Sequence, residues 1–385
     1  MTGPLNAFFA SLAPGSTVSL RAGGCYLTQG TVHIDRTAGV TIEGNGATFE
    51  RTSAQLSTGW LPHVSLDGNS HLSITDLKIK GTYVPGKSPT GHEGHYGLVL
   101  RLDHGVTLTG LSVSGVSGDF ITLFPAPVNT PDQSLNTDVS VTDSAFDGAG
   151  YHGVTIESAD GATFSHDTFS HIALDSVDLE YDIYPTVFVH GQPTTAAEDH
   201  VTFDHDTWVD DRGVWFVSFQ GQKVQENDVT ITNNTLHGTG FSVAVTGNAA
   251  APNRGLTITG NKATNAGAIW GGSIAEPGTG VSIFLRHVAS VTVTQNAVRF
   301  WDGNPTYYPN HPWITAVELQ GVKDAIVEDN SFTGAWAPVK IDSQPHQPYA
   351  GAPTTGVAEC GNQYWVRSSH RGPECPLVAA GGRRR

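Results

Sequence analysis

The sequence has few of the residues that helical proteins use in quantity. Among its 385 residues there is one methionine, three cysteines, and only 15% of charged residues. Glycine, by contrast, occurs 45 times and threonine is plentiful. This composition is typical of many short strands joined by tight turns, and it argues against an all-α protein.

Basic residues are also scarce. The chain has 20 Lys and Arg against 36 Asp and Glu, a formal net charge of −16. Nucleic-acid phosphates are bound by clustered Lys and Arg, so we expect no nucleic-acid partner, and Arg383, Arg384 and Arg385 form only a short basic tail. No apolar run approaches the roughly 20 residues of a membrane span, so we expect no membrane partner.

The first residues, MTGPLNAFFASLAPGS, lack the basic segment and long apolar core of a signal peptide. Either the protein stays inside the cell, or this is a mature form without its leader. Cys360 and Cys375 bracket a loop, and a disulfide between them would stabilise the fold by roughly 3 kcal/mol. Such a bond favours a secreted or cell-surface protein. The alternative is two free thiols in a cytosolic chain. Cys25, between Gly24 and Tyr26, is expected to be structural.

An eight-residue pattern recurs ten times along the chain. It reads apolar, usually Thr or Ser, apolar, two polar residues often including Asn or Asp, any residue, and then usually an apolar residue. The copies are VTIEGNGA at 40, LSITDLKI at 72, VTLTGLSV at 106, VSVTDSAF at 139, ATFSHDTF at 162, VTFDHDTW at 201, VTITNNTL at 229, LTITGNKA at 256, VTVTQNAV at 291 and AIVEDNSF at 325. The alternation predicts a strand with one buried face. The Asn or Asp after it suits a turn with left-handed backbone.

A second apolar strand lies between successive copies. The segments are GLVLR at 97, FITLF at 120, GVTIES at 153, SVDLEY at 176, GVWFVSF at 213 and GVSIFLR at 280. One such unit cannot bury its own apolar face, whereas stacked units share a core. A β-sandwich would show hairpin turns and strands spaced about 8 to 12 residues apart. The period of about 30 residues instead predicts an all-β, single-domain parallel β-helix of about ten coils.

The two ends of the chain are expected to differ from the β-helix. Leu5, Phe8, Phe9 and Leu12 lie at helical spacing and predict a short capping helix within residues 1–14. The parallel β-helix should then occupy residues 15–345. Residues 346–385 are expected to form a C-terminal loop segment with the possible disulfide and the basic tail.

Several of these segments resemble a known superfamily. The stretch AGGCYLTQGTVHIDRTAGVTIEGNGATFE, together with GDFITL at 118, GYHGVTI at 150 and SVDLEYD at 176, is similar to the right-handed parallel β-helix proteins of the pectin-lyase-like superfamily, in particular exported bacterial β-helix-repeat proteins. The resemblance implies carbohydrate-active chemistry in a groove along one sheet, with a polysaccharide or oligosaccharide as partner.

Stacking the second strands by their inward residues predicts three columns of outward residues. The columns are Val99, Thr122, Thr155, Asp178, Trp215; Arg101, Phe124, Glu157, Glu180, Val217; and Tyr96, Asp119, His152, Asp175, Arg212. Neighbouring coils lie about 4.8 Å apart, so the acids in these columns should repel one another, which lets at least one carboxyl keep a proton for general acid catalysis.

We therefore predict Asp178 and Glu180 as the first catalytic candidates. Their partners would be Glu157, Asp175, Asp119 and His152, and the substrate-binding candidates are Arg101, Arg212, Trp215, Tyr181 and His95. Carboxylates about 5 Å apart would suit a retaining glycosidase, and a wider separation would suit an inverting one. The HxxH spacing of His92 and His95 lacks a third ligand, so no metal site is predicted.

Three functions fit these residues. The first is a glycoside hydrolase that needs no cofactor. The second is a polysaccharide lyase or uronate epimerase in which the acids hold Ca²⁺, with Arg101, Arg212 or Lys223 as base. The third is a non-catalytic glycan-binding or structural β-helix. The sequence leaves open the sugar, the linkage, the stereochemistry, endo or exo action and the oligomeric state.

Overall fold

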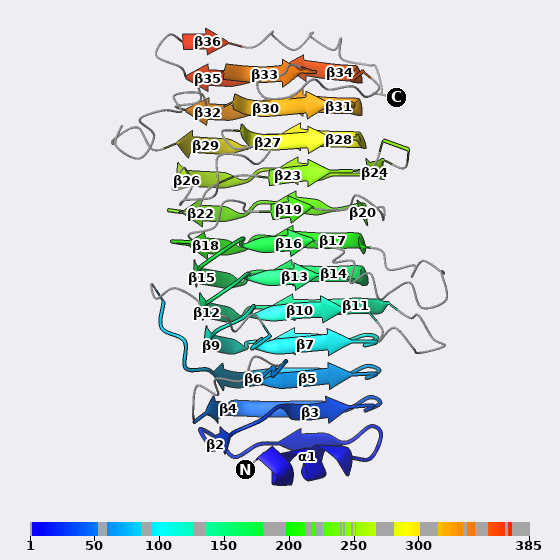
Figure 1. The fold of residues 1–385 in the computed structure, drawn as a ribbon, viewed down its shortest axis with the longest axis vertical. Coiled ribbons are helices and arrows are strands. Elements are labelled where there is room, and N and C mark those ends of the chain that lie inside the picture. Colours follow the sequence, from blue (N-terminus) through cyan, green and yellow to red (C-terminus); the bar gives the residue numbers. More distant parts are fainter. Residues whose placement is uncertain are drawn as a thin grey trace, which may run out of the picture.

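The computed structural model confirms the parallel β-helix. It describes residues 2–52, 60–85, 94–125, 135–179, 198–211, 217–219, 226–238, 241, 243–247, 249–250, 252–266, 281–300, 315–333, 337–342, 353–365 and 369–371. The strands stack coil upon coil along one long axis (Figure 1). Every strand pairing in this part of the chain is parallel except one, at the C-terminal end.

The second strands of the repeat form one sheet of eleven parallel strands, the eleven-stranded sheet, at the front of Figure 1. In order they are β3 (Val32–Asp35), β5 (Val64–Asp67), β7 (Leu98–Arg101), β10 (Ile121–Phe124), β13 (Val154–Ile156), β16 (Val177–Leu179), β19 (Val217–Phe219), β23 (Val243–Thr246), β27 (Val281–Arg286), β30 (Thr315–Gln320) and β33 (Ala337–Ile341).

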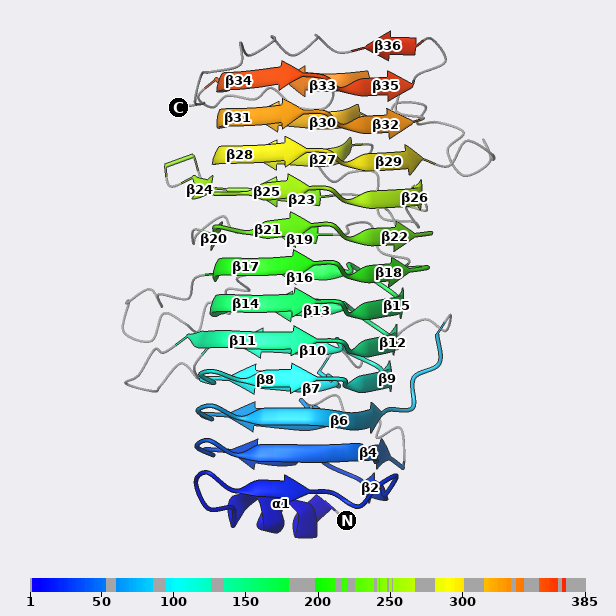
Figure 2. The same ribbon diagram turned by 180° about the vertical axis from the view of Figure 1, so that it is seen from behind.

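The ten repeat copies form the strands on the opposite side, which Figure 2 shows. They lie in β4 (Thr41–Arg51), β6 (Ser73–Lys80), β8 (Thr107–Thr109), β11 (Asn136–Thr142), β14 (Ala159–Ser165), β17 (Glu198–Asp204), β21 (Thr230–Thr232), β25 (Thr257–Thr259), β28 (Val288–Thr294) and β31 (Lys323–Glu328). Two strands that the pattern missed, β1 (Thr17–Ser19) and β34 (Thr355–Cys360), extend this row by parallel pairing with β4 and β31.

A third row of short strands completes each coil. It comprises β2 (Cys25–Thr28), β9 (Ser112–Val116), β12 (Ala145–Ala149), β15 (Thr168–Ile172), β18 (Thr207–Val209), β22 (Thr235–His237), β26 (Lys262–Ala266), β29 (Ala297–Phe300), β32 (Ser331–Thr333) and β35 (Gln363–Trp365); the short β20 (Glu226–Asn227) and β24 (Asn253–Arg254) lie at one corner. Inside the coils aromatic rings stack in register, as Phe146, Phe169 and Trp208 do with centroids 4.7 and 4.0 Å apart. These stacks fill the core that single coils could not close.

The helix α1 (Thr2–Ala10) covers the N-terminal end of the stack, as expected (Figure 1). Its Leu5 and Phe9 are buried against the first coils, but Phe8 is 43% exposed, contrary to the apolar face predicted for it. Asn6 fixes the helix to the first edge of the eleven-stranded sheet, because it donates to the carbonyl of Thr31 and accepts from the amide of His33.

The C-terminal segment differs from the loop expected for residues 346–385. There β34 and β35 continue the β-helix, and β36 (Ser369–Arg371) pairs antiparallel with β35. Cys360 is disulfide-bonded, and its predicted partner Cys375 lies outside the described residues. Cys25 is a free thiol and is exposed, so it does not pack in the core as predicted. No helix in the described part of the chain is long and apolar enough to cross a membrane.

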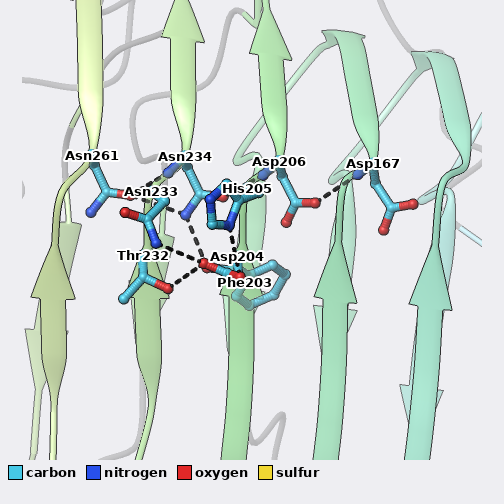
Figure 3. Close-up of polar contacts among 9 residues, drawn as sticks. All are labelled: Asp167, Phe203, Asp204, His205, Asp206, Thr232, Asn233, Asn234 and Asn261. Carbon is cyan, nitrogen blue, oxygen red and sulfur yellow. Dashed lines mark hydrogen bonds and ion pairs between the residues drawn. The ribbon is translucent and has the colours of Figure 1, made fainter.

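A column of buried polar residues, the polar ladder, runs along the turn that follows the repeat strands. Its members are Ser144, Asp167, Asp206, Asn234, Asn261, Asn296, Asn330 and Asn362. In each of the first seven members the main-chain N–H donates a hydrogen bond to the side-chain oxygen of the next member, with N···O distances of 2.7 to 3.1 Å. Figure 3 shows the middle of the ladder. The residue before each member, such as His205 or Asn233, has positive φ, which confirms the left-handed turn predicted after each strand.

Candidate active site on the eleven-stranded sheet

The register confirms two of the predicted columns over four strands. Thr155 of β13 lies opposite Thr122 of β10 on one side and Asp178 of β16 on the other. The backbone of the neighbouring column is in register too, since Gly97 donates to the carbonyl of Asp119 and Gly153 to that of Asp175. Asp119, His152 and Asp175 therefore follow one another on successive coils, beside the Thr122–Thr155–Asp178 column.

Asp119 acts as a fixed acceptor between these columns. Its Oδ1 accepts the main-chain N–H of His152 at 2.9 Å, and its Oδ2 accepts the hydroxyls of Thr122 at 3.1 Å and Thr155 at 2.8 Å. The side chain is only 2% exposed. Three donors satisfy a buried carboxylate and hold it in one position, so Asp119 ties the strands of the site together.

His152 and Asp178 form a buried pair beside it. The Nε2 atom of His152 lies 3.6 Å from Oδ2 of Asp178, and the two residues are 7% and 1% exposed. Burial lowers the pKa of His152 to about 4, against the opposing effect of a backbone hydrogen bond to Asp175. The imidazole is therefore neutral at physiological pH, and its Nε2 atom lies near a carboxyl group at slightly more than hydrogen-bond distance.

One edge of the pair is more open. Tyr151 packs its ring edge-to-face against His152, with centroids 4.2 Å apart, and it is partly exposed, as is Asp175. Leu174, next to Asp175 in the chain, is 38% exposed.

Arg101 and Glu157 occupy the next outward column. Glu157 is 8% exposed and Arg101 is half-buried. Burial lowers the pKa of Arg101, while the charges of Asp67 and Glu157 oppose that shift. The guanidinium lies over the ring of Trp60, with Cζ 4.6 Å from the ring centroid. The sequence reading overlooked Trp60, which precedes β5 in the otherwise ordinary stretch GWLPH.

His95 is 5% exposed and lies near a second histidine, His63, and not beside the acidic residues of the predicted columns. The neighbouring His63 is 4% exposed, and burial together with Arg51 and His95 lowers the pKa of His63 to about 3. Among the described residues no group of three or more His, Cys, Asp or Glu is arranged to hold a metal ion. His92, the other half of the HxxH spacing, lies outside them.

Four of the predicted site residues, Glu180, Tyr181, Arg212 and Trp215, also lie outside the described residues. The predicted alignment of the last strand is nevertheless wrong. Val217, and not Val214, lies opposite Val177, so Ser218 takes the place beside Asp178 that was predicted for Trp215. In the segment VWFVSF both sets of alternating residues are largely apolar. Either set could face the core, so the sequence of such a strand does not define its register.

Burial is the second difference from the sequence reading. Outward residues of a sheet were expected to face solvent, yet Thr122, Thr155 and Asp178 are at most 7% exposed. Thr122 and Thr155 were predicted as ordinary outward residues, but they hold Asp119 in place. A Thr on each of two neighbouring coils next to an Asp was the signal that could have shown this.

Comparison with known proteins supports the fold. A sequence model of the family described as "Right handed beta helix region" matches residues 20–299. No curated protein sequence matches the chain. An alginate lyase from Paenibacillus sp. str. FPU-7 superposes with a TM-score of 0.53 at 15% identity, over 88% of this chain and 95% of that one.

Two further structures are similar. The endo-xylogalacturonan hydrolase from Aspergillus tubingensis has a TM-score of 0.53 at 13% identity, over 98% of this chain and 93% of that one. The tailspike protein of E. coli bacteriophage HK620, solved as a double mutant, has a TM-score of 0.61 at 12% identity, over 95% of this chain and 62% of that one. At such identities the likeness shows the fold alone.

Proposed function

The chain belongs to the right-handed β-helix family, and on that premise we propose that it is a carbohydrate-active enzyme that cleaves a glycosidic bond. The reaction would take place on the outward face of β10, β13 and β16. The observation that carries the proposal is the buried carboxyl of Asp178, 3.6 Å from Nε2 of a neutral His152. Two of the similar structures, the alginate lyase and the xylogalacturonan hydrolase, act on polysaccharides by name.

Asp178 would protonate the leaving oxygen of the scissile bond. General acid catalysis needs a proton-carrying group held within hydrogen-bond reach of that oxygen, and in the proposed reaction the carboxyl of Asp178 would supply the proton. His152 would orient Asp178 and exchange a proton with it. Asp119 would be a positioning residue, because its oxygens already accept three hydrogen bonds.

Glu157 and Glu180 are the candidates for the second carboxylate. Glu157 lies one coil away from Asp178 and two residues further along the strand, on the same outward face. With about 3.3 Å per residue and about 4.8 Å between strands, their Cα atoms are roughly 8 Å apart. This backbone spacing is compatible with the roughly 6.5 to 9.5 Å between the carboxyl groups of an inverting glycosidase, which leaves room for a water molecule. We therefore propose inversion, with Glu157 activating the water.

The test is the variant Asp178→Asn, which keeps the shape of the side chain and removes its proton. Purified protein would be screened against a panel of neutral and acidic polysaccharides for new reducing ends. We expect activity to fall by at least about 100-fold, as is usual when a general acid is removed. Asp143→Asn, an exposed carboxylate on the opposite face, is the matched control. Full activity of a correctly folded Asp178→Asn variant would refute the proposal.

A lyase or uronate epimerase is the second candidate, because a neutral His152 can also accept a proton from the carbon next to a uronate carboxylate. Such a reaction would call for a cation, Ca²⁺ in the first instance, to neutralise the uronate. Ultraviolet absorbance of an unsaturated product and loss of turnover with a chelator would identify it. Saturable binding of an oligosaccharide without any turnover would instead indicate a glycan-binding β-helix.

We further propose that the protein acts outside the cell or at its surface. The disulfide bond at Cys360 supports this location, since disulfides persist in oxidising compartments. Fractionation of the native host, followed by detection of the chain in the medium or on the cell surface, would test it.

A further inference from the structure

Trp60 is a large aromatic side chain that the described fold leaves open to solvent. It is 47% exposed, although the structure buries most rings of this size. It lies before β5, at the side of the eleven-stranded sheet that carries Arg101 and Phe124. An exposed aromatic ring alone means little, so what holds this ring in place decides its significance.

The ring of Trp60 is held from two directions. The guanidinium of Arg101 covers it, with Cζ 4.6 Å from the ring centroid, and Phe124 meets it edge-to-face at 5.5 Å and 83°. Tyr96 supports Phe124 in turn, again edge-to-face at 5.6 Å. With Arg101 over one face of the ring, the residue is still 47% exposed, which leaves surface that a ligand can contact.

The main chain next to Trp60 is fixed as well. Leu61 donates its N–H to the carbonyl of Gly94 at 2.8 Å. The buried Arg51 donates to the carbonyls of Leu61 and Pro62, both at 2.9 Å, and Thr31 donates to Pro62 at 2.8 Å. A ring anchored in this way loses little freedom when a ligand stacks on it, which favours binding.

Trp60 lies beside the same sheet as Asp178, several coils nearer the N-terminal end. Arg101, which backs the ring, lies on β7, three coils before β16. Three coils correspond to about 14 Å along the axis. A glycan lying along the sheet with its scissile bond at Asp178 would therefore place a sugar several units away over Trp60.

The charges around the ring indicate which sugar would bind. Asp67, Glu157, Asp35 and Asp103 all act on the charge of Arg101. These acidic side chains offset the attraction of the guanidinium for a uronate carboxylate. The apolar face of a neutral pyranose, by contrast, gains from stacking on indole without needing a counter-charge.

We propose that Trp60, backed by Arg101 and Phe124, is a sugar-stacking subsite for a neutral glycan, at the N-terminal side of the cleavage site. The proposal rests on the proposed function for the position of the scissile bond, but it predicts binding that can be measured without turnover.

The test is oligosaccharide binding by the full-length chain, measured by calorimetry with neutral hexasaccharides of glucose, xylose and mannose and with a galacturonate hexasaccharide. We expect a neutral hexasaccharide to bind, and Trp60→Ala to weaken that binding about tenfold, the equivalent of about 1.4 kcal/mol. Trp60→Phe, which keeps an aromatic face, should recover part of the loss. Leu27→Ala, a change at a 48% exposed residue of β2, is the control and should bind like the wild type.

Equal affinity of Trp60→Ala and wild type would overturn the subsite, as would exclusive binding of the galacturonate oligosaccharide or no binding of any probe. The experiments distinguish a failure of the catalytic proposal from a failure of the Trp60 subsite. Trp60-dependent binding without turnover of any polysaccharide would refute the catalytic proposal alone. Turnover with a KM that Trp60→Ala leaves unchanged would refute the subsite alone.

Discussion

The two aspartates in the polar ladder lead to a quantitative prediction about pH. Where the ladder is asparagine, each side-chain amide donates in two directions, as Asn234 does to Oδ1 of Asn261 and to the carbonyl of Phe203, both at 3.0 Å. Asp206 occupies the preceding step (Figure 3). Its Oδ2 is buried without a hydrogen-bond partner, at the position where the repeat would place an amide donor between two acceptor oxygens.

A proton on Oδ2 of Asp206 resolves this conflict, because the carboxylic acid can donate where a carboxylate would face oxygen atoms. Burial raises the pKa of Asp206 from 3.8 to about 8, and the neighbouring charges of Asp167 and Asp204 act in the same direction. A carboxyl group whose pKa is raised in the folded state does not stabilise the fold at any pH above its pKa in the unfolded state. Between pH 4 and pH 8 the unfolded state releases this proton and the folded state keeps it, so stability falls as the pH rises.

The magnitude follows from the shift. At pH 7 the solution lies about 3 pH units above the unfolded pKa, and at 1.36 kcal/mol per unit the buried acid costs about 4 kcal/mol. Asp206→Asn removes this cost and restores the amide donor of the ladder. With an unfolding entropy of about 2.1 cal/mol/K per residue over 385 residues, 4 kcal/mol corresponds to a rise in Tm of about 5 °C.

The assay is thermal unfolding followed by circular dichroism at about pH 4 and about pH 7, at one scan rate because large proteins often unfold irreversibly. Asp206→Asn should raise Tm at the higher pH and change it little at the lower one. Asp143→Asn, the same change at an exposed turn residue outside the ladder, is the control and should leave Tm nearly unchanged. A lower Tm of Asp206→Asn at pH 7, or an unchanged slope of Tm against pH, would refute the protonated ladder.

Three further predictions concern stability. Burial lowers the pKa of His63 to about 3 and that of His152 to about 4, from an ordinary value of 6.5. The stability of the fold should therefore decrease as the pH drops from 6.5 towards 4, because only the unfolded state takes up these protons. His63→Gln should reduce that loss of stability in the same melting assay. Gly153→Ala would place a Cβ atom against the main-chain carbonyl of Ser176 and should lower Tm strongly. The control Gly3→Ala lies in α1 with open space around the added Cβ atom, and it should raise Tm slightly. Equal effects of the two variants would contradict this packing. Reduction of the disulfide at Cys360 should cost roughly 3 kcal/mol of stability, and a Tm insensitive to reductant would contradict it.

Much of the fold could be predicted because its determinants are local. Each repeat copy carries its own alternation of apolar and polar residues, and the period between copies defines the coil. The same pattern missed β1 and β34, whose sequences TVSL and VAEC fit it less well. The confirmed columns of Thr155, Asp178 and His152 likewise follow from clear alternation in β13 and β16.

The site was less predictable because its properties depend on neighbouring coils. Asp119 was a plausible acid by sequence, but Thr122 beside it and two donors from the next coil, His152 and Thr155, make it a fixed acceptor. Trp60 has no neighbour in sequence that identifies it, and its significance comes from Arg101 and Phe124, about 40 and 60 residues away in the chain.

The amino-acid sequence by itself determined the class of fold, the direction of the strands and the residues that point out of the core, because hydrophobic alternation acts within each strand. Only the tertiary structure decided the register of β19 and the burial of Asp178 beside His152, which makes this part of the sheet a candidate active site. These properties arise from contacts between coils, and a strand that is apolar in both phases, such as VWFVSF, carries no local information about them.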